Sequence, residues 1–294
     1  MPNQSPSQSP NQPNAVLLIH CPDQRGLVAQ IAQFIFQYNG NIIHSDHHTD
    51  QQSGLFLMRL EWETSGFQIG RDEFAAAFLP LARKMNLQWE IHYRDQPDRV
   101  ALFVSKQSHC LYDLLWRSAE GELPCEVALV ISNHPDLGPA VEKFGIPFHV
   151  FPITADTKLA QEKAEIELLR QHRIDLVVLA RYMQVLSPQM VEAFPNHIIN
   201  IHHSFLPAFV GAKPYHQAFE RGVKLIGATS HYATAELDQG PIIEQDVARS
   251  SHRDTVEDMV RKGRDLERVV LARAVRLHLE RRVIPYGRKT VIFD

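Results

Sequence analysis

The stretch HIINIHHSFLP, residues 197–207, joins a short apolar run to an asparagine, two histidines and a proline. A short apolar run of this kind is typical of a strand buried on both faces, and such strands belong to parallel sheets covered by helices. In an open α/β sheet, ligands bind beyond the carboxyl ends of the strands. The stretch therefore predicts an α/β fold and a candidate site at Asn200 and His202.

These two side chains are predicted to point the same way. Residues two apart on a strand share a face, so Asn200 and His202 point together, while Ile201 and His203 point to the other side. An amide and an imidazole on one face can donate hydrogen bonds to an oxygen that gains negative charge when a carbonyl is attacked. From these residues alone, capping of the strand end remains the alternative interpretation.

Further apolar runs alternate with helical patterns on both sides of this stretch and predict a doubly wound, mostly parallel sheet. The expected strands are VALFVS (100–105), EVALVIS (126–132), PFHVF (147–151) and DLVVLA (175–180), and the expected helices begin at Ser108, Pro139, Lys158 and Ser187. After Phe209 the order changes. KLIGATSHY (224–232) and PIIEQDV (241–247) are expected to pair as antiparallel strands, followed by one long helix from Thr255 to about Arg281.

The N-terminal part has a different pattern. It is read as strand 15–21, helix 26–38, strand 41–49, strand 54–63, helix 71–85 and strand 87–93, a ferredoxin-like βαββαβ unit. The polar, proline-containing segment RDQPDR (94–99) follows it. We therefore expect a regulatory-type domain at 14–94, an α/β domain at 95–294, and a disordered tail at 1–13, where Pro, Gln, Ser and Asn offer little to bury.

Composition excludes several classes of protein. The 294 residues suit one large and one small domain, and the net charge of −4 argues against a nucleic-acid-binding surface. Three cysteines without CxxC spacing indicate neither a disulfide framework nor a thiolate zinc site, so a reducing cytoplasm is expected. Apolar runs fall short of the roughly 18 residues that span a bilayer, and the N-terminus lacks the pattern of a signal peptide.

A second motif, ATSHYATAELDQGPIIEQ (228–245), places Asp238 in an Asp-Gln-Gly-Pro turn. Alone it predicts only a hairpin, because Asp and Gly favour turns for conformational reasons. Together with NIHHSFLPAF, however, it resembles the folate-dependent formyltransferase family, whose pattern is Asn-x-His-x-Ser-x-x-Pro followed by an Asp-x-Gly loop. The resemblance implies that Asn200, His202 and Asp238 are catalytic.

The form HHSFLPAFVGAKPYHQA (202–218) resembles the formyltetrahydrofolate deformylase branch of that family, which also carries an N-terminal ACT domain. The resemblance extends from about Ala15 to the end of the chain. It implies hydrolysis of 10-formyltetrahydrofolate to tetrahydrofolate and formate, which feeds purine synthesis and balances one-carbon pools.

The alternative is a formyl transferase that uses an amine acceptor. The family's glycinamide-ribonucleotide transformylase holds the acceptor's phosphate at a glycine-rich turn after its first strand. This chain reads VALFVSKQSHCLYDLL (100–115) there, without glycine, which favours water as the acceptor. A non-enzymatic amino-acid sensor that merely binds folate is a further alternative.

The same resemblance implies a set of substrate contacts and a regulatory site. The residues expected to contact the folate are Arg181, Tyr182, Met183, Val185, Ser204, His231 and Ala233. In ACT domains the turn after the first strand contacts small amino-acid effectors, which here implies Asp23, Arg25 and Gly26, and ACT units associate, so a homo-oligomer is expected. Neither a cofactor nor a metal is expected, and HSDHHTD (44–50) is not read as a metal site because adjacent strand histidines face opposite ways.

Overall fold

The computed structural model describes residues 14–207 and 214–294. The predicted tail at 1–13 therefore lies outside the described residues. The chain divides into two compact units between Gln96 and Pro97, and Phe293 and Asp294 at the C-terminal end belong to the first unit. The sequence places the boundary at residue 94, within the same polar linker.

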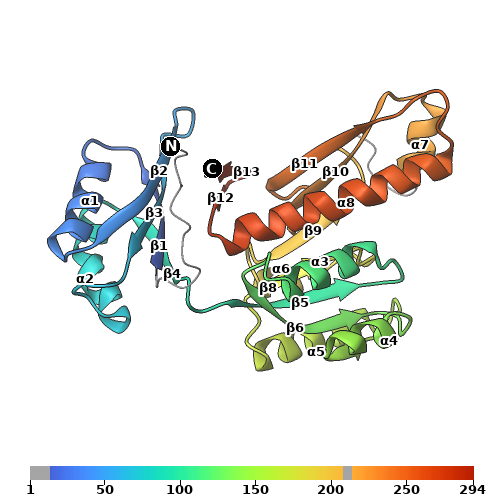
Figure 1. Cartoon of the computed structure of the whole chain (residues 1–294), viewed down its shortest axis with the longest axis horizontal. Coiled ribbons are helices and arrows are strands. Elements are labelled where there is room, and N and C mark those ends of the chain that lie inside the picture. The colour runs from blue at the N-terminus through green and yellow to red at the C-terminus, as the bar shows by residue number, and fades with distance from the viewer. Residues whose placement is uncertain (1–13, 208–213) are drawn as a thin grey trace, which may run out of the picture. The chain divides into compact units, whose positions relative to one another are not determined.

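The first unit confirms the predicted βαββαβ order. Its elements are β1 (Asn14–Pro22), α1 (Leu27–Gln37), β2 (Asn41–Asp50), β3 (Leu55–Glu63), α2 (Arg71–Lys84) and β4 (Gln88–Tyr93). The sheet has the order β2-β3-β1-β4, with every neighbouring pair antiparallel. Figure 1 shows α1 and α2 on the same face of this sheet.

Alternation along β3 explains why one face is covered by helices. Phe56, Met58, Leu60 and Trp62 belong to the apolar core that the sheet forms with α1 and α2. Residues of the opposite parity point to the other face, where Arg59 and Glu61 form a buried ion pair of 2.6 Å.

The second unit carries the predicted α/β sheet. Its strands are β5 (Asp98–Val104), β6 (Cys125–Ser132), β7 (Phe148–Val150), β8 (Leu176–Leu179), β9 (Ile198–His202), β10 (Leu225–Tyr232) and β11 (Ile242–Arg249), in the order β11-β10-β9-β8-β5-β6-β7. The pairs from β7 to β9 are parallel, whereas β9–β10 and β10–β11 are antiparallel. The mostly parallel sheet and the antiparallel pair at its edge are both as predicted.

Helices cover both faces of this sheet (Figure 1). They are α3 (His109–Ala119), α4 (Gly138–Val141), α5 (Lys158–Gln171), α6 (Pro188–Ala193), α7 (Pro214–Glu220) and α8 (Val256–Leu279). Along β5, Val100, Leu102 and Val104 join one core and Ala101 and Phe103 join the other, so a uniformly apolar strand is buried on both sides.

Three elements depart from the sequence prediction. The helix expected from Pro139 is one turn, α4, continued by a 3₁₀ turn over Glu142–Phe144. Neither α7 nor the closing hairpin of β12 (Val283–Tyr286) and β13 (Lys289–Ile292) was predicted. These segments are too short to show a clear hydrophobic period.

All three cysteines are free. No helix in the described ranges combines the length and the apolarity that a membrane span requires.

Candidate active site

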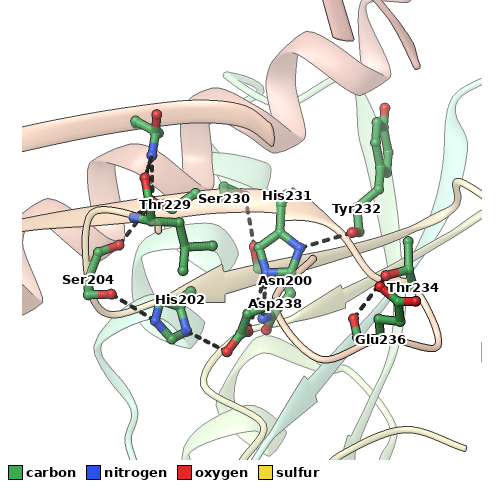
Figure 2. Close-up of polar contacts among 12 residues, drawn as sticks. Asn200, His202, Ser204, Thr229, Ser230, His231, Tyr232, Thr234, Glu236 and Asp238 are labelled. Atoms are coloured by element: carbon green, nitrogen blue, oxygen red, sulfur yellow. Dashed lines mark hydrogen bonds and ion pairs between the residues drawn. The ribbon is translucent and has the colours of Figure 1, made fainter. Parts of the chain in front are cut away.

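The end of β9 and the turn after β10 meet in space. Asn200 and His202 lie on β9, and Asp238 lies in the connection between β10 and β11. Asp238 has φ of 55°, a left-handed conformation that Asp and Asn adopt more readily than most residues. Its Oδ2 lies 3.2 Å from His202 Nδ1. Figure 2 draws this contact as a dashed line. The structure therefore brings together the three side chains that the motifs single out.

His231, on β10, lies behind this trio. Its Nδ1 lies 2.9 Å from the carbonyl oxygen of Tyr232. Because a carbonyl only accepts, Nδ1 is the donor, and the other nitrogen of the neutral ring, Nε2, is an acceptor. Asn200 Nδ2 donates to that atom, His231 Nε2, at 3.2 Å, and Asp238 Oδ1 lies 3.6 Å from it. His231 thus holds the Asn200 amide in a fixed orientation, leaving the second N–H of Nδ2 for another acceptor.

Ser204 contacts His202 from the other side. Its Oγ lies 2.8 Å from His202 Nε2, and Figure 2 shows the imidazole between Ser204 and Asp238. The Asp238 carboxylate can only accept, so His202 Nδ1 carries a hydrogen and Nε2 of a neutral ring accepts from the serine hydroxyl. Ser204 is buried and does not line the cavity, so it orients His202 instead of meeting a ligand directly.

His202 keeps Asp238 ionised. Burial by itself raises the pKa of this carboxyl, but the hydrogen bond from His202 lowers it more, so the pKa lies well below its usual range. At neutral pH the trio therefore contains a desolvated carboxylate, an oriented amide and an imidazole.

His203 corrects one sequence-based prediction. It was expected to face away from His202, yet both residues line the same cavity, with ring centroids 5.2 Å apart. The cause is that β9 ends at His202, so the strand alternation does not extend to the next residue. Burial, followed by the charge of Arg181, lowers the pKa of His203 to about 4, so this ring is neutral at physiological pH.

The trio opens into a cavity of about 590 Å³. Six of the seven predicted substrate contacts line it, namely Arg181, Tyr182, Met183, Val185, His231 and Ala233. Met183 and Val185 are more than half exposed and form an apolar rim, as does Leu237 beside the trio. Tyr182 is buried and stacks on Phe103. The loop after β8 therefore forms one wall of the cavity.

Two buried acids of α5 accept hydrogen bonds from residues of this wall. Glu162 accepts hydrogen bonds from the Ser187 backbone N–H at 3.1 and 3.3 Å, and Glu165 Oε1 accepts from the Tyr182 hydroxyl at 3.3 Å. Glu165 is 0% exposed, and its Oε2 has no hydrogen-bond partner among the described residues. Burial and the charge of Glu162 raise the pKa of Glu165 to about 7.

We expect Glu165→Gln to stabilise the protein above neutral pH. A folded-state pKa of about 7 means that Glu165 contributes stability below its unfolded pKa of about 4.3 and loses it as pH rises through 7. The shift corresponds to about 3–4 kcal/mol, and the variant should therefore unfold at a higher temperature than the wild type at pH 8 but not at pH 4. Thermal unfolding over pH 4–9 measures this, with Glu167→Gln, an exposed acid of the same helix, as the control. Parallel pH profiles for all three proteins would contradict it.

A buried cluster on another part of the cavity wall was not predicted. Glu267 of α8 accepts a hydrogen bond from the Tyr215 hydroxyl at 2.7 Å and lies 2.7 Å from His109 Nε2 and 3.4 Å from Arg181 Nε. Arg181 Nε also donates to Gln107 Oε1 at 3.1 Å. His109, Arg181, Tyr215 and Glu267 are called the Glu267 cluster below.

The Glu267 cluster could have been detected from the helical period of α8. Met259, Gly263, Glu267, Val270 and Leu271 are all buried, so one acid stands on the apolar stripe of an amphipathic helix. A buried carboxylate needs partners, and its position on the stripe predicts a polar cluster. The identity of the partners is set by three other elements and has no local sequence pattern.

This cluster overlaps a possible set of metal ligands. Ligand atoms of His109, Cys110 and Glu267 lie within 4.8 Å of one another. The Arg181 guanidinium already contacts the Glu267 carboxylate, and burial raises the pKa of the Cys110 thiol well above its ordinary value. Both features disfavour a cation, and the cluster is better described as a hydrogen-bonded ion network.

The predicted effector residues belong to the first unit. Asp23, Arg25 and Gly26 are exposed in the turn between β1 and α1, and Gly26 has φ of 86° directly before the helix. Gly26 allows the sharp entry into α1 that this turn requires.

Known proteins resemble the chain in sequence and in structure. Residues 98–275 match the formyl transferase family model. The formyltetrahydrofolate deformylase of Synechocystis sp. is 63% identical over 279 residues, covering 95% of this chain and 98% of that protein.

Solved structures agree. A formyltetrahydrofolate deformylase from Pseudomonas syringae superposes with a TM-score of 0.95 at 50% identity, covering 97% of this chain and 95% of that one. A glycinamide ribonucleotide transformylase from Symbiobacterium toebii has a TM-score of 0.65 at 37% identity, covering 69% of this chain and 97% of that one. The chain belongs to the formyl transferase family and, within it, to the formyltetrahydrofolate deformylases.

Proposed function

We propose that the chain hydrolyses 10-formyltetrahydrofolate to tetrahydrofolate and formate, supplying formate to purine synthesis. The observation that carries this proposal is the trio of Asn200, His202 and Asp238 in the lining of a cavity of about 590 Å³. Membership of the deformylases over nearly the whole chain supports the same reaction.

Asp238 is the general base in this proposal. Its low pKa keeps the carboxylate ionised, so it accepts a proton from a water molecule as the water oxygen attacks the formyl carbon. A positioned base of this kind typically contributes about 10²- to 10⁴-fold. His202 Nδ1 carries a hydrogen beside Asp238, so once the carboxylate has taken the water proton the pair holds one proton that it can give to the leaving group.

Asn200 and His202 complete the reaction. The amide N–H of Asn200 that His231 leaves free donates to the formyl oxygen as that oxygen becomes negative. His202 then gives its Nδ1 proton to N10 of the folate as the bond between carbon and N10 breaks, which releases formate, and the protonated Asp238 returns a proton to Nδ1. Ser204 and His231 act as positioning residues, and the loops at Tyr182–Val185 and at Ala233 enclose the pteridine.

The test is formate release by the purified protein from 10-formyltetrahydrofolate in water alone. We expect formate and tetrahydrofolate to appear in equal amounts, at a rate that added glycinamide ribonucleotide or aminoacyl-tRNA leaves unchanged. Release only in the presence of an amine acceptor would favour a transferase, and folate binding without turnover would favour a sensor.

We also propose a role for the first unit, an oligomeric state and a cellular location. The βαββαβ unit is proposed to act as an ACT domain that binds a small amino acid at Asp23, Arg25 and Gly26 and pairs the chain into a homo-oligomer. A helix N-terminus suits the carboxylate of such an effector. A cytoplasmic location is proposed from the cysteine pattern.

A further inference from the structure

The Glu267 cluster joins four elements on one wall of the cavity. His109 begins α3, Arg181 follows β8, Tyr215 lies on α7 and Glu267 lies on α8. Glu267, the hub, is 1% exposed, and Arg181 is 7% exposed. The proposed mechanism of hydrolysis uses none of these four side chains.

Arg181 occupies its place at a conformational cost. Its φ is 65°, in the left-handed region where a non-glycine residue is disfavoured by about 1 kcal/mol or more. Such strain persists only where surrounding contacts hold it, and it gathers at functional sites. Here the contacts to Gln107 and Glu267 hold the Arg181 side chain against the cavity.

Tyr215 also depends on an unusual feature. A Cβ atom on Gly263 would lie 2.1 Å from the Tyr215 hydroxyl, so only glycine at this turn of α8 lets the ring reach Glu267. The close approach of α7 and α8 therefore serves to place Tyr215 beside Arg181 and His203.

The cluster contacts the turn that follows β5. Gln107 and His109 stand at the start of α3, and their side chains are bonded to Arg181 and Glu267. The related transformylase is expected to hold its acceptor's phosphate at this turn, through open backbone N–H groups. In this chain the Gln107 and His109 side chains at the same turn are bonded to Arg181 and Glu267.

We infer that the Glu267 cluster, with Arg181 as its central filler, excludes amine acceptors from the cavity and thereby restricts the formyl group to water. The inference rests on the proposed hydrolysis and identifies the side chains that make the reaction specific for water. Removing the Arg181 side chain admits a small amine, whose nitrogen attacks the formyl carbon. The bond from that carbon to N10 breaks, the amine loses a proton through Asp238 and His202, and N10 gains one.

The test compares Arg181→Gly with the wild type in the presence of glycinamide at about pH 8. Glycine removes the side chain and also relieves the left-handed strain, so the backbone is expected to be retained. Mass spectrometry measures N-formylglycinamide and formate in the same reaction. The ratio of amide to formate should rise with glycinamide concentration, to about tenfold or more above the wild-type ratio, a discrimination typical of a single pocket group.

Three further variants isolate the cause. Arg173→Gly is the matched control, because Arg173 also has a positive φ but is exposed, and it should form formate alone. Arg181→Met keeps most of the bulk and should also exclude the amine. Tyr215→Ala opens the same wall from α7 and should admit it, which covers the case in which Arg181→Gly does not fold.

Two results would overturn the inference. The first is a folded Arg181→Gly that releases formate but leaves glycinamide unformylated at every concentration. The second is a folded Arg181→Gly that forms neither product, because Arg181 would then belong to the hydrolytic machinery. A wild type that releases no formate would instead refute the proposed function, so the two failures are distinguishable.

Discussion

Asp238→Asn should reduce formate release by about 10²- to 10⁴-fold, the usual contribution of a positioned general base. The amide is close in size to the carboxylate but cannot take a proton from water. Asparagine tolerates the left-handed conformation at this position about as well as aspartate does, so the turn is expected to be retained. The loss should fall on kcat with little change in KM, because the carboxylate acts on the water and not on the bound folate.

Asp246→Asn is the control for this substitution. Asp246 lies on the neighbouring strand β11 and pairs with Arg273 on the surface, so the same chemical change there should leave turnover unaltered. The pH profile adds a second measurement. Because the pKa of Asp238 lies below its usual range, the carboxylate stays ionised as pH falls from 7 to 5 and should cause no loss of activity there. Near-normal turnover of Asp238→Asn would remove the base from the mechanism.

The sequence predicted the parts of the site that short-range patterns encode. The apolar run before Asn200 identifies a buried strand, and the position of polar residues at its carboxyl end identifies a ligand-binding edge. The Asp-Gln-Gly-Pro turn predicts a hairpin, but only the family pattern connects Asp238 with a strand end 36 residues earlier in the chain.

The parts that were missed depend on tertiary contacts. Glu267 and Glu165 stand on buried helix stripes, yet their partners lie on other elements, at Tyr215, His109 and Tyr182. Long-range polar pairs of this kind have no local period in the sequence. The error at His203 has a different origin, since strand alternation holds only while the strand lasts, and β9 ends one residue earlier.

The sequence alone does not distinguish residues that contact the substrate from residues that orient the catalytic side chains. His231 and Ser204 were both expected to contact the substrate. Ser204 contacts His202 and is absent from the cavity lining, whereas His231 lines the cavity and also holds Asn200. A hydrogen-bond donor beside a catalytic residue looks the same in sequence whether it faces the ligand or the protein. Only the direction of the side chain decides, and for His231 this direction follows from its register opposite Asn200 in the pairing of β9 with β10.

Asn200→Ala should lower kcat by about 10²- to 10³-fold, equivalent to about 3–4 kcal/mol of lost stabilisation of the developing oxyanion. The structure supports an effect of this size, because His231 fixes the amide in advance and the second N–H needs no reorganisation at the moment of reaction. KM should change less than kcat, since the donor is needed most strongly when the formyl oxygen carries charge.

Asn200→Asp sharpens the test because it keeps the shape but replaces the donor with a second carboxylate near Asp238. Repulsion of the developing oxyanion should make this variant slower than Asn200→Ala, although it removes fewer atoms. Asn196→Asp is the matched control, since Asn196 is exposed, precedes the same strand, and has a positive φ that Asp also tolerates. If Asn200→Asp turned over faster than Asn200→Ala, the side chain would act by filling space and not by donating to an oxyanion.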